Sequence, residues 1–81
     1  MTVLPNPFSA SLNIKLSAIG MTEVRITDAL GAPLFSQHSG NGIEVVWDGR
    51  TTSGAEVPPG MYFVTVITAD GQRYTQRVVK Q

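Results

Sequence analysis

The chain is short, has no net charge and contains no cysteine. Its 81 residues suffice for one small domain. Six basic and six acidic side chains cancel, which leaves no cationic field to gather the phosphates of a nucleic acid. The lack of cysteine excludes disulfide bonds, thiolate metal ligands and a cysteine nucleophile. No apolar run approaches the roughly 20 residues of a membrane helix or resembles a signal peptide, so we expect any export signal at the N-terminus to belong to a longer precursor.

The first segment predicts the edge of a sheet, followed by a half-buried strand. Pro5 and Pro7 each remove a backbone donor, which is tolerated at an edge and not in a central strand. We expect Leu4 and Phe8 to hold this segment against the core. Residues 11–17 then alternate apolar and polar side chains with a period of two, which indicates a strand with one buried face.

The remaining strands follow at intervals of about ten residues. Residues 23–30, 33–38 and 43–47 predict three of them, and the Gly- and Pro-rich stretch 48–60 is typical of a long loop. Residues 60–67 are apolar on both faces, which indicates a central strand and the longest one. Asp70-Gly71 favours a two-residue type I′ turn, and residues 73–80 complete the last hairpin.

Seven short strands with no helical period predict the fold class. The pattern is typical of an all-β, seven-stranded antiparallel immunoglobulin-like β-sandwich. A closed small barrel is the alternative. Alternation predicts an inward set of aliphatic and aromatic side chains: Leu12, Ile14, Leu16, Val24, Ile26, Leu30, Leu34, Ile43, Val45, Trp47, Tyr62, Val64, Val66, Tyr74 and Val78.

A second apolar set falls on the opposite phase of the strands. Its members are Phe35, Val46, Phe63, Ile67 and Val79. If that face is open, it forms an exposed apolar strip of the kind that marks a contact surface.

The sequence does not indicate catalysis or metal binding. His38 is the only histidine, and a Ser-His-Asp arrangement would need Asp28 or Asp48 at its ring; a solvated histidine at a strand end is the simpler interpretation. A calcium site in the Asp48 loop would need a run of closely spaced oxygen ligands that is not present. We therefore expect no enzyme, no catalytic residue, no cofactor and no metal.

Four short motifs, in this order and spacing, resemble one known family. Leu4-Pro5-Asn6-Pro7-Phe8 is similar to an opening P-N-P motif, and Asp28-Ala29-Leu30-Gly31 to a D-x-x-G turn followed by an apolar residue, here Leu34. Gly60-Met61-Tyr62-Phe63-Val64 is similar to G-x-Y-x-V, and residues 74–80 to a basic and aliphatic terminal strand. The family is the type A C-terminal sorting domain of proteins exported by the type IX secretion system of Bacteroidetes.

The resemblance implies a function, partners and a location. It implies one immunoglobulin-like domain over residues 1–81, excised from a longer secreted precursor whose cargo domain lies on the N-terminal side. The secretion machinery would read the domain after transit through the periplasm. A sortase-like peptidase at the cell surface would then remove it, leaving the cargo at the surface or secreted. The implied recognised region consists of Gly60, Tyr62, Arg77, Val78, Val79 and Lys80, with Pro5, Asn6 and Pro7 on the first strand.

Part of the chain is equally similar to another group. Residues 47–62, W-D-G-R-x-x-x-G-x-x-V-x-x-G-x-Y, resemble the immunoglobulin-like domain of flagellar hook-cap proteins and related repeats of secreted enzymes. There the domain is structural or adhesive, which is the alternative function for this chain. The terminal Arg77-Val78-Val79-Lys80-Gln81 favours the sorting function.

The predicted edges imply two kinds of contact. We expect the machinery to read the folded last hairpin, through edge backbone groups and a basic rim on its terminal strand. The edge at the proline-bearing first strand could also pair two copies as a weak homodimer.

Overall fold

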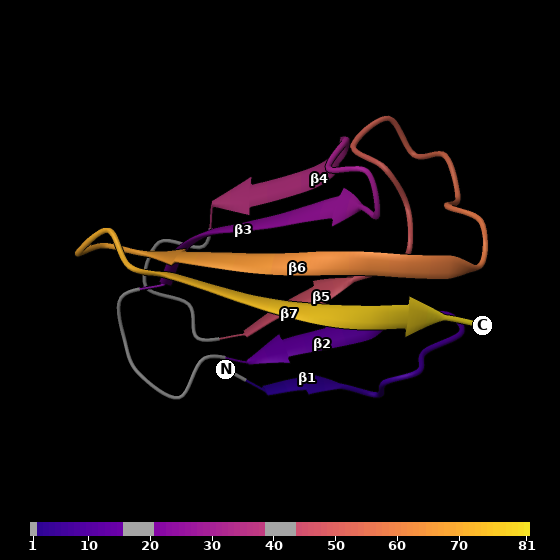
Figure 1. Ribbon diagram of the computed structural model, residues 1–81, viewed down its shortest axis with the longest axis horizontal. Coiled ribbons are helices and arrows are strands. Elements are labelled where there is room, and N and C mark those ends of the chain that lie inside the picture. Colours follow the sequence, from indigo (N-terminus) through magenta and orange to yellow (C-terminus); the bar gives the residue numbers. More distant parts are fainter. Residues whose placement is uncertain (1, 16–20, 39–43) are drawn as a thin grey trace.

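The computed structural model describes residues 2–15, 21–38 and 44–81. In these parts of the chain, seven strands form two antiparallel sheets that pack face to face (Figure 1). The three-stranded sheet has the order β1-β2-β5, with β1 at Thr2–Leu4, β2 at Leu12–Lys15 and β5 at Glu44–Trp47. The four-stranded sheet has the order β4-β3-β6-β7, with β4 at Pro33–His38, β3 at Met21–Asp28, β6 at Gly60–Thr68 and β7 at Arg73–Lys80.

This arrangement confirms the predicted seven-stranded immunoglobulin-like sandwich. The strands belong to two separate sheets, so the closed barrel was the wrong alternative. β6 is the longest strand and lies between β3 and β7, as its two apolar faces predicted. β1 lies at a sheet edge, also as predicted, and Pro5 and Pro7 follow it, each after a cis peptide bond. No helix that could span a membrane is found in the described residues.

The core lies between the two sheets, with Trp47 at its centre. The Trp47 ring contacts those of Phe8 (5.6 Å between centroids) and Tyr62 (5.9 Å). Most of the predicted inward set is buried, and Leu34 packs partly against it. The confirmed buried positions are Leu12, Ile14, Val24, Ile26, Val45, Trp47, Tyr62, Val64, Val66 and Val78. Leu16 and Ile43 lie outside the described residues.

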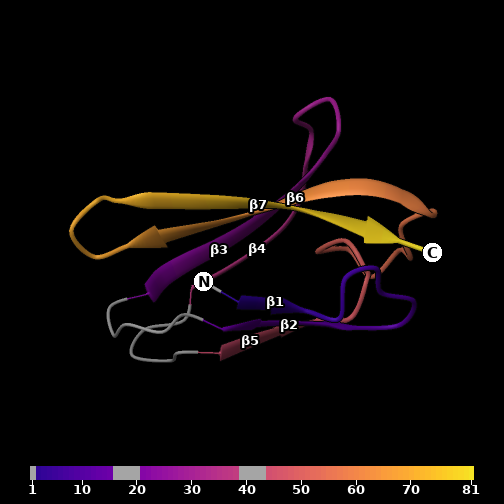
Figure 2. The same ribbon diagram turned by 60° about the horizontal axis from the view of Figure 1, so that its bottom comes forward.

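Three side chains that were expected inside are exposed. Leu30 is 95% exposed because it projects from the β3–β4 turn. Leu4 is 58% exposed because β1 pairs Val3 with the buried Ile14 and thereby turns Val3, not Leu4, inward. Tyr74 is 43% exposed although it pairs with the buried Val66. It lies near the hairpin end of β6 and β7, which extends past the strands of the other sheet (Figure 2).

Phe35 is the opposite case, because it was expected to face outward and faces the core. Its ring lies 6.4 Å from that of Trp47. The register between β3 and β4 shifts after Ile26, so that Phe35 pairs with Ile26 while Leu34 has no partner. Such a β-bulge turns two successive side chains toward one face, which strict alternation does not allow. The other members of the second apolar set are divided between the outer faces of the two sheets, Val46 on β5 and the rest on β6 and β7.

The β6–β7 hairpin is present, but its turn differs from the predicted type I′. Gly71 N–H donates to the Thr68 carbonyl (3.0 Å), and Thr68 N–H donates to the Gln72 carbonyl (2.9 Å). Gly71 has a φ of 86°, whereas no described residue other than glycine has a positive φ. A type I′ turn needs positive φ at both central residues, so this is a three-residue turn that ends with a left-handed glycine. The same hydrogen-bond pattern recurs at Gly31 and Gly54.

Candidate recognition site at the end of β7

β6 and β7 bring the implied recognition residues side by side. In their register Gly60 pairs with Lys80, and Tyr62 pairs with Val78. The G-x-Y motif and the terminal strand are therefore neighbours across one antiparallel ladder, as the sequence predicted. Arg77 and Val79 alternate with Val78 and point to the outer face of the four-stranded sheet, where both are exposed.

The N-terminal arm, residues 5–8, lies along the other edge of β7. Asn6 Oδ1 accepts a hydrogen bond from Val79 N–H (3.0 Å), and Asn6 Nδ2 donates to the Arg77 carbonyl (3.3 Å). Phe8 N–H donates to the Val79 carbonyl (2.9 Å), and its own carbonyl accepts from Gln81 N–H (2.8 Å). The P-N-P motif and the terminal strand thus form one site, although they lie at opposite ends of the chain.

The residue types explain how the arm can pair with a strand. Proline has no backbone N–H, so Pro5 and Pro7 cannot donate to the edge of β7. The Asn6 side chain carries one amide donor and one carbonyl acceptor, and it uses both in place of a peptide group. Phe8 then resumes backbone pairing as a parallel bridge to Lys80, with its ring 1% exposed against Trp47.

This arrangement corrects the expected edge contact. A receptor was expected to pair with the edge of β7 beside residues 78–80, but the arm occupies that edge from the Arg77 carbonyl to Gln81 N–H. At the C-terminal end of β7, therefore, a receptor can reach the outer face of the sheet and the arm. The backbone groups of this edge are already paired with the arm.

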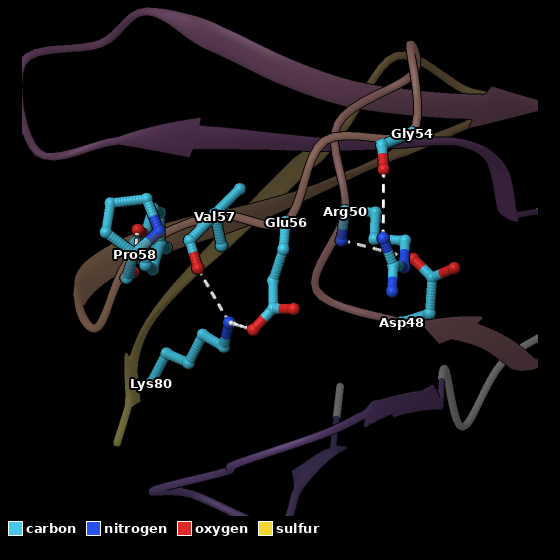
Figure 3. Close-up of polar contacts among 8 residues, drawn as sticks. Asp48, Arg50, Gly54, Glu56, Val57, Pro58 and Lys80 are labelled. Atoms are coloured by element: carbon cyan, nitrogen blue, oxygen red, sulfur yellow. Dashed lines mark hydrogen bonds and ion pairs between the residues drawn. The ribbon is translucent and has the colours of Figure 1, made fainter.

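Lys80 is not part of a basic rim. The residue is only 5% exposed, because it alternates with Val78 and shares its inward face. Its Nζ donates to the Val57 carbonyl (2.6 Å) and to Glu56 Oε1 (3.2 Å), which ties β7 to the loop between β5 and β6 (Figure 3). The period-two pattern places Lys80 on the same face as the buried Val78, so the sequence did indicate an inward side chain. The positive charge of Lys80 suggested an exposed one instead.

The loop of residues 48–59 is ordered by its own polar contacts. Asp48 Oδ1 accepts from Arg50 N–H (3.1 Å), and the Arg50 guanidinium donates to the Gly54 carbonyl (3.0 Å) (Figure 3). Trp47 Nε1 donates to the Arg50 carbonyl (2.8 Å), so the loop closes over the core. The carboxylate of Asp48 thus serves turn geometry. In the described ranges no three His, Asp or Glu side chains gather as metal ligands would.

Tyr62 contributes a partly buried hydroxyl to the same loop. The hydroxyl donates to the Pro58 carbonyl, and the ring packs edge-on against Trp47. Burial raises the pKa of the Tyr62 phenol, and the negative charge of Asp28 raises it further. The sequence pattern missed Val57, which is buried in the loop and belongs to the same core cluster as Tyr62.

His38 lies far from Asp28, one of the two acids considered for a catalytic triad. It is exposed at the end of β4 and pairs with Glu23 of β3, whereas Asp28 lies five residues further along that strand. At about 3.3 Å per residue the separation along β3 is roughly 16 Å. Glu23, the acid that does face His38, accepts a hydrogen bond from Arg25 (2.8 Å). This hydrogen bond lowers the pKa of the Glu23 carboxyl.

Comparisons with known proteins decide the family. A family model described as "Secretion system C-terminal sorting domain" matches residues 2–81. The chain belongs to this family. The resemblance to the sorting domains of type IX secretion is thereby confirmed, and the sorting domain is a C-terminal signal that directs an attached cargo through that system.

Solved structures agree with this assignment. The sorting domain is similar to part of PorZ, an essential bacterial surface component of the type-IX secretion system of Porphyromonas gingivalis, with 27% identity and a TM-score of 0.81. The match covers 99% of the sorting domain and only 11% of PorZ. CopC from Methylosinus trichosporium OB3b shares the fold, with 17% identity, a TM-score of 0.53, and coverage of 94% of this chain and 82% of CopC. A comparison with curated protein sequences found no match.

Proposed function

We propose that the secretion machinery reads the sorting domain as a folded unit, at the surface where the N-terminal arm meets the end of β7, and that the domain itself catalyses nothing. The pairing of residues 5–8 with residues 77–81 carries this proposal. It makes two distant motifs into one surface that exists only after folding. A receptor that reads this surface accepts a cargo only when the whole sandwich has formed.

The proposal includes the route and the fate of the domain. A cargo on the N-terminal side would pass through the periplasm with the domain attached, and a sortase-like peptidase at the cell surface would remove it. β1 separates residues 5–8 from a preceding cargo, so the linker to the cargo would begin at the other end of that three-residue strand (Figure 1).

A structural or adhesive module is the second candidate function, and the likeness to part of PorZ favours it. PorZ is described as a surface component, and the matched region is a small part of that protein. The parent gene separates the two functions. A single copy at the end of a long exported precursor supports sorting, and tandem or central copies support a structural module.

A weak homodimer through edge strands remains part of the proposal. β1 and β5 form the two edges of the three-stranded sheet, and they span three and four residues. Edges this short offer few backbone groups to a second copy, so we expect association only at high concentration. Sedimentation of the protein over a range of concentrations tests this.

Export of a reporter cargo fused to the domain tests the sorting surface. Asn6→Ala removes both side-chain hydrogen bonds to β7, and we expect it to reduce export while the domain stays folded. Asn13→Ala, an exposed asparagine on β2, is the matched control and should export normally. Removing residues 75–81 should abolish export, and Arg25→Ala should not change it.

Two results would contradict the proposal. The first is normal export of the chain that lacks residues 75–81. The second is normal export by Asn6→Ala when amide exchange shows that Val79 N–H has lost its protection, because the arm would then be detached without consequence.

A further inference from the structure

The edge of β7 is divided into a covered half and an open half. Backbone groups of successive residues point to alternate sides of a strand, and Val79 N–H points to the edge that Asn6 covers. The backbone groups of Arg73 and Thr75, and the N–H of Arg77, therefore point to this same edge. Nothing among the described residues bonds to them there. We call these groups the open edge.

The other edges of the sandwich are less available to a partner strand. β1 and β5 span only three and four residues. β4 begins with Pro33, contains the bulge at Leu34, and has its Leu34 carbonyl bonded to Thr52 N–H (3.0 Å). Prolines, bulges and covering loops are the usual means of blocking an edge. β7 keeps a regular register with β6 over its whole length and has none of these between residues 73 and 77.

The side chains along the open edge have a definite chemistry. Arg73, Thr75 and Arg77 point to the outer face and are exposed, and neither arginine forms an ion pair with a described residue. Glu23, which lies in the same row of the face as Arg73, is already bonded to Arg25.

Tyr74 lies on the inner side of the open edge. It is 43% exposed and is the second residue of β7, next to the hairpin end that extends past the strands of the three-stranded sheet (Figure 2). A strand added beside β7 would therefore meet arginines on one face of the sheet and a half-exposed aromatic ring on the other.

We propose that the open edge binds, by strand addition, an extended segment of a partner protein with acidic side chains at positions i and i+4. These acids would lie beside Arg73 and Arg77, with a hydroxyl or small residue beside Thr75 between them. The intervening residue next to Tyr74 would be apolar. Opposite charges in directly facing positions of a sheet stabilise the pairing, so the open edge should prefer a segment with this pattern of acids. The inference rests on the proposed function, since it assigns a partner to the same terminal strand.

A second copy of this chain fits the open edge poorly. Antiparallel self-pairing centred on Thr75 would place Arg73 of one copy opposite Arg77 of the other. Like charges directly opposite each other destabilise a sheet. An anionic lipid surface would satisfy the arginines but would make no use of the free backbone groups.

The substitution Thr75→Pro separates these cases. The Thr75 N–H points away from β6, so proline at this position removes an edge donor without breaking the β6–β7 ladder. Thr75→Val is the matched control. Both variants lose the hydroxyl contact to Thr65 (3.1 Å), but valine keeps the backbone N–H that proline lacks. Backbone NMR spectra of both variants should show the folded sandwich.

The probe is a blocked peptide, Glu-Val-Thr-Val-Glu, with Lys-Val-Thr-Val-Lys as its charge-reversed partner. The acidic peptide should shift the amide signals of residues 73–77 and slow the exchange of Thr75 N–H. Thr75→Pro should weaken its binding at least roughly tenfold, while Thr75→Val should stay within about twofold of the unchanged protein. The double substitution Arg73→Glu with Arg77→Glu should reverse the preference between the two peptides.

Each contrary outcome overturns the inference. Equal binding of the acidic peptide by Thr75→Pro and Thr75→Val excludes strand addition. Binding to phosphatidylglycerol vesicles that Thr75→Pro leaves unchanged, with no peptide binding, assigns the arginines to a lipid surface. Self-association that Thr75→Pro abolishes assigns the edge to a second copy.

The export assay keeps this inference distinct from the proposed function. If Thr75→Pro exports a cargo normally while removal of residues 75–81 blocks export, the inference fails and the sorting surface stands. If the shortened chain is exported as well, the proposed function fails.

Discussion

The two halves of β7 differ in burial, in pairing and in chemistry, although they belong to one regular strand. In the C-terminal half, Val78 is fully buried and Lys80 almost so, and the N-terminal arm covers the edge. In the N-terminal half, Tyr74 is 43% exposed and the edge is bare among the described residues. The register with β6 continues without interruption through both halves.

The difference shows that burial along β7 depends on which parts of the chain pack against its inner face. The loop of residues 48–59 and the Phe8 ring face the C-terminal half, and the three-stranded sheet ends before the hairpin end of the N-terminal half (Figure 2). One half therefore attaches the strand to the core, and the other half presents it to solvent. Three substitutions, each compared with a substitution in the open half, test this division.

The largest effect is expected for Phe8→Ala. The Phe8 ring is buried against Trp47 and its backbone pairs with β7, so we expect the free energy of unfolding to fall by about 3–5 kcal/mol. Urea denaturation measures the loss. Tyr74→Ala removes an aromatic ring from the open half and should cost less than about 1 kcal/mol. Equal losses for the two rings would show that the halves are not distinct.

A smaller effect is expected for Lys80→Met. Methionine keeps most of the buried aliphatic stem but leaves the Val57 carbonyl without its donor, which should cost about 1–3 kcal/mol. Arg73→Met, in the open half, should stay within about 0.5 kcal/mol of the unchanged protein. Glu56 is mostly exposed, so Glu56→Gln should also change stability by less than about 1 kcal/mol. An unchanged urea midpoint for Lys80→Met would exclude a stabilising role for the buried amine.

The smallest effect is expected for Tyr62→Phe, which loses the hydrogen bond to the Pro58 carbonyl and should cost about 0.5–1.5 kcal/mol near neutral pH. Its pH dependence is more informative. Burial, with a further contribution from Asp28, raises the pKa of Tyr62, so the folded protein holds the phenolic proton more tightly than the unfolded chain does. This contribution to stability is complete below the unfolded pKa of about 10 and is lost as the pH rises through the folded pKa.

Thermal unfolding between pH 8 and pH 11 should therefore show a steeper alkaline loss for the unchanged protein than for Tyr62→Phe. Tyr74→Phe, which changes the half-exposed ring of the open half, is the control and should keep the steep loss. Identical pH profiles for the unchanged protein and Tyr62→Phe would mean that another group causes the alkaline sensitivity.

The sequence by itself determined the strands and the fold class, because alternation with a period of two is a local property of the chain. It predicted β4 and β7 with their observed bounds, the central position of β6 and the edge position of β1. The motif order also identified the family, and the neighbouring positions of Tyr62 and Val78 followed from the hairpin.

Only the tertiary structure decided which part of each face is covered and which edges are paired. Period two says that Tyr74 and Val78 share a face, but not that the opposing layer ends between them. It does not reveal the bulge that turns Phe35 inward, or the buried amine of Lys80. The contact between Asn6 and Val79 joins residues from opposite ends of the chain, so it arises only when the two sheets have packed.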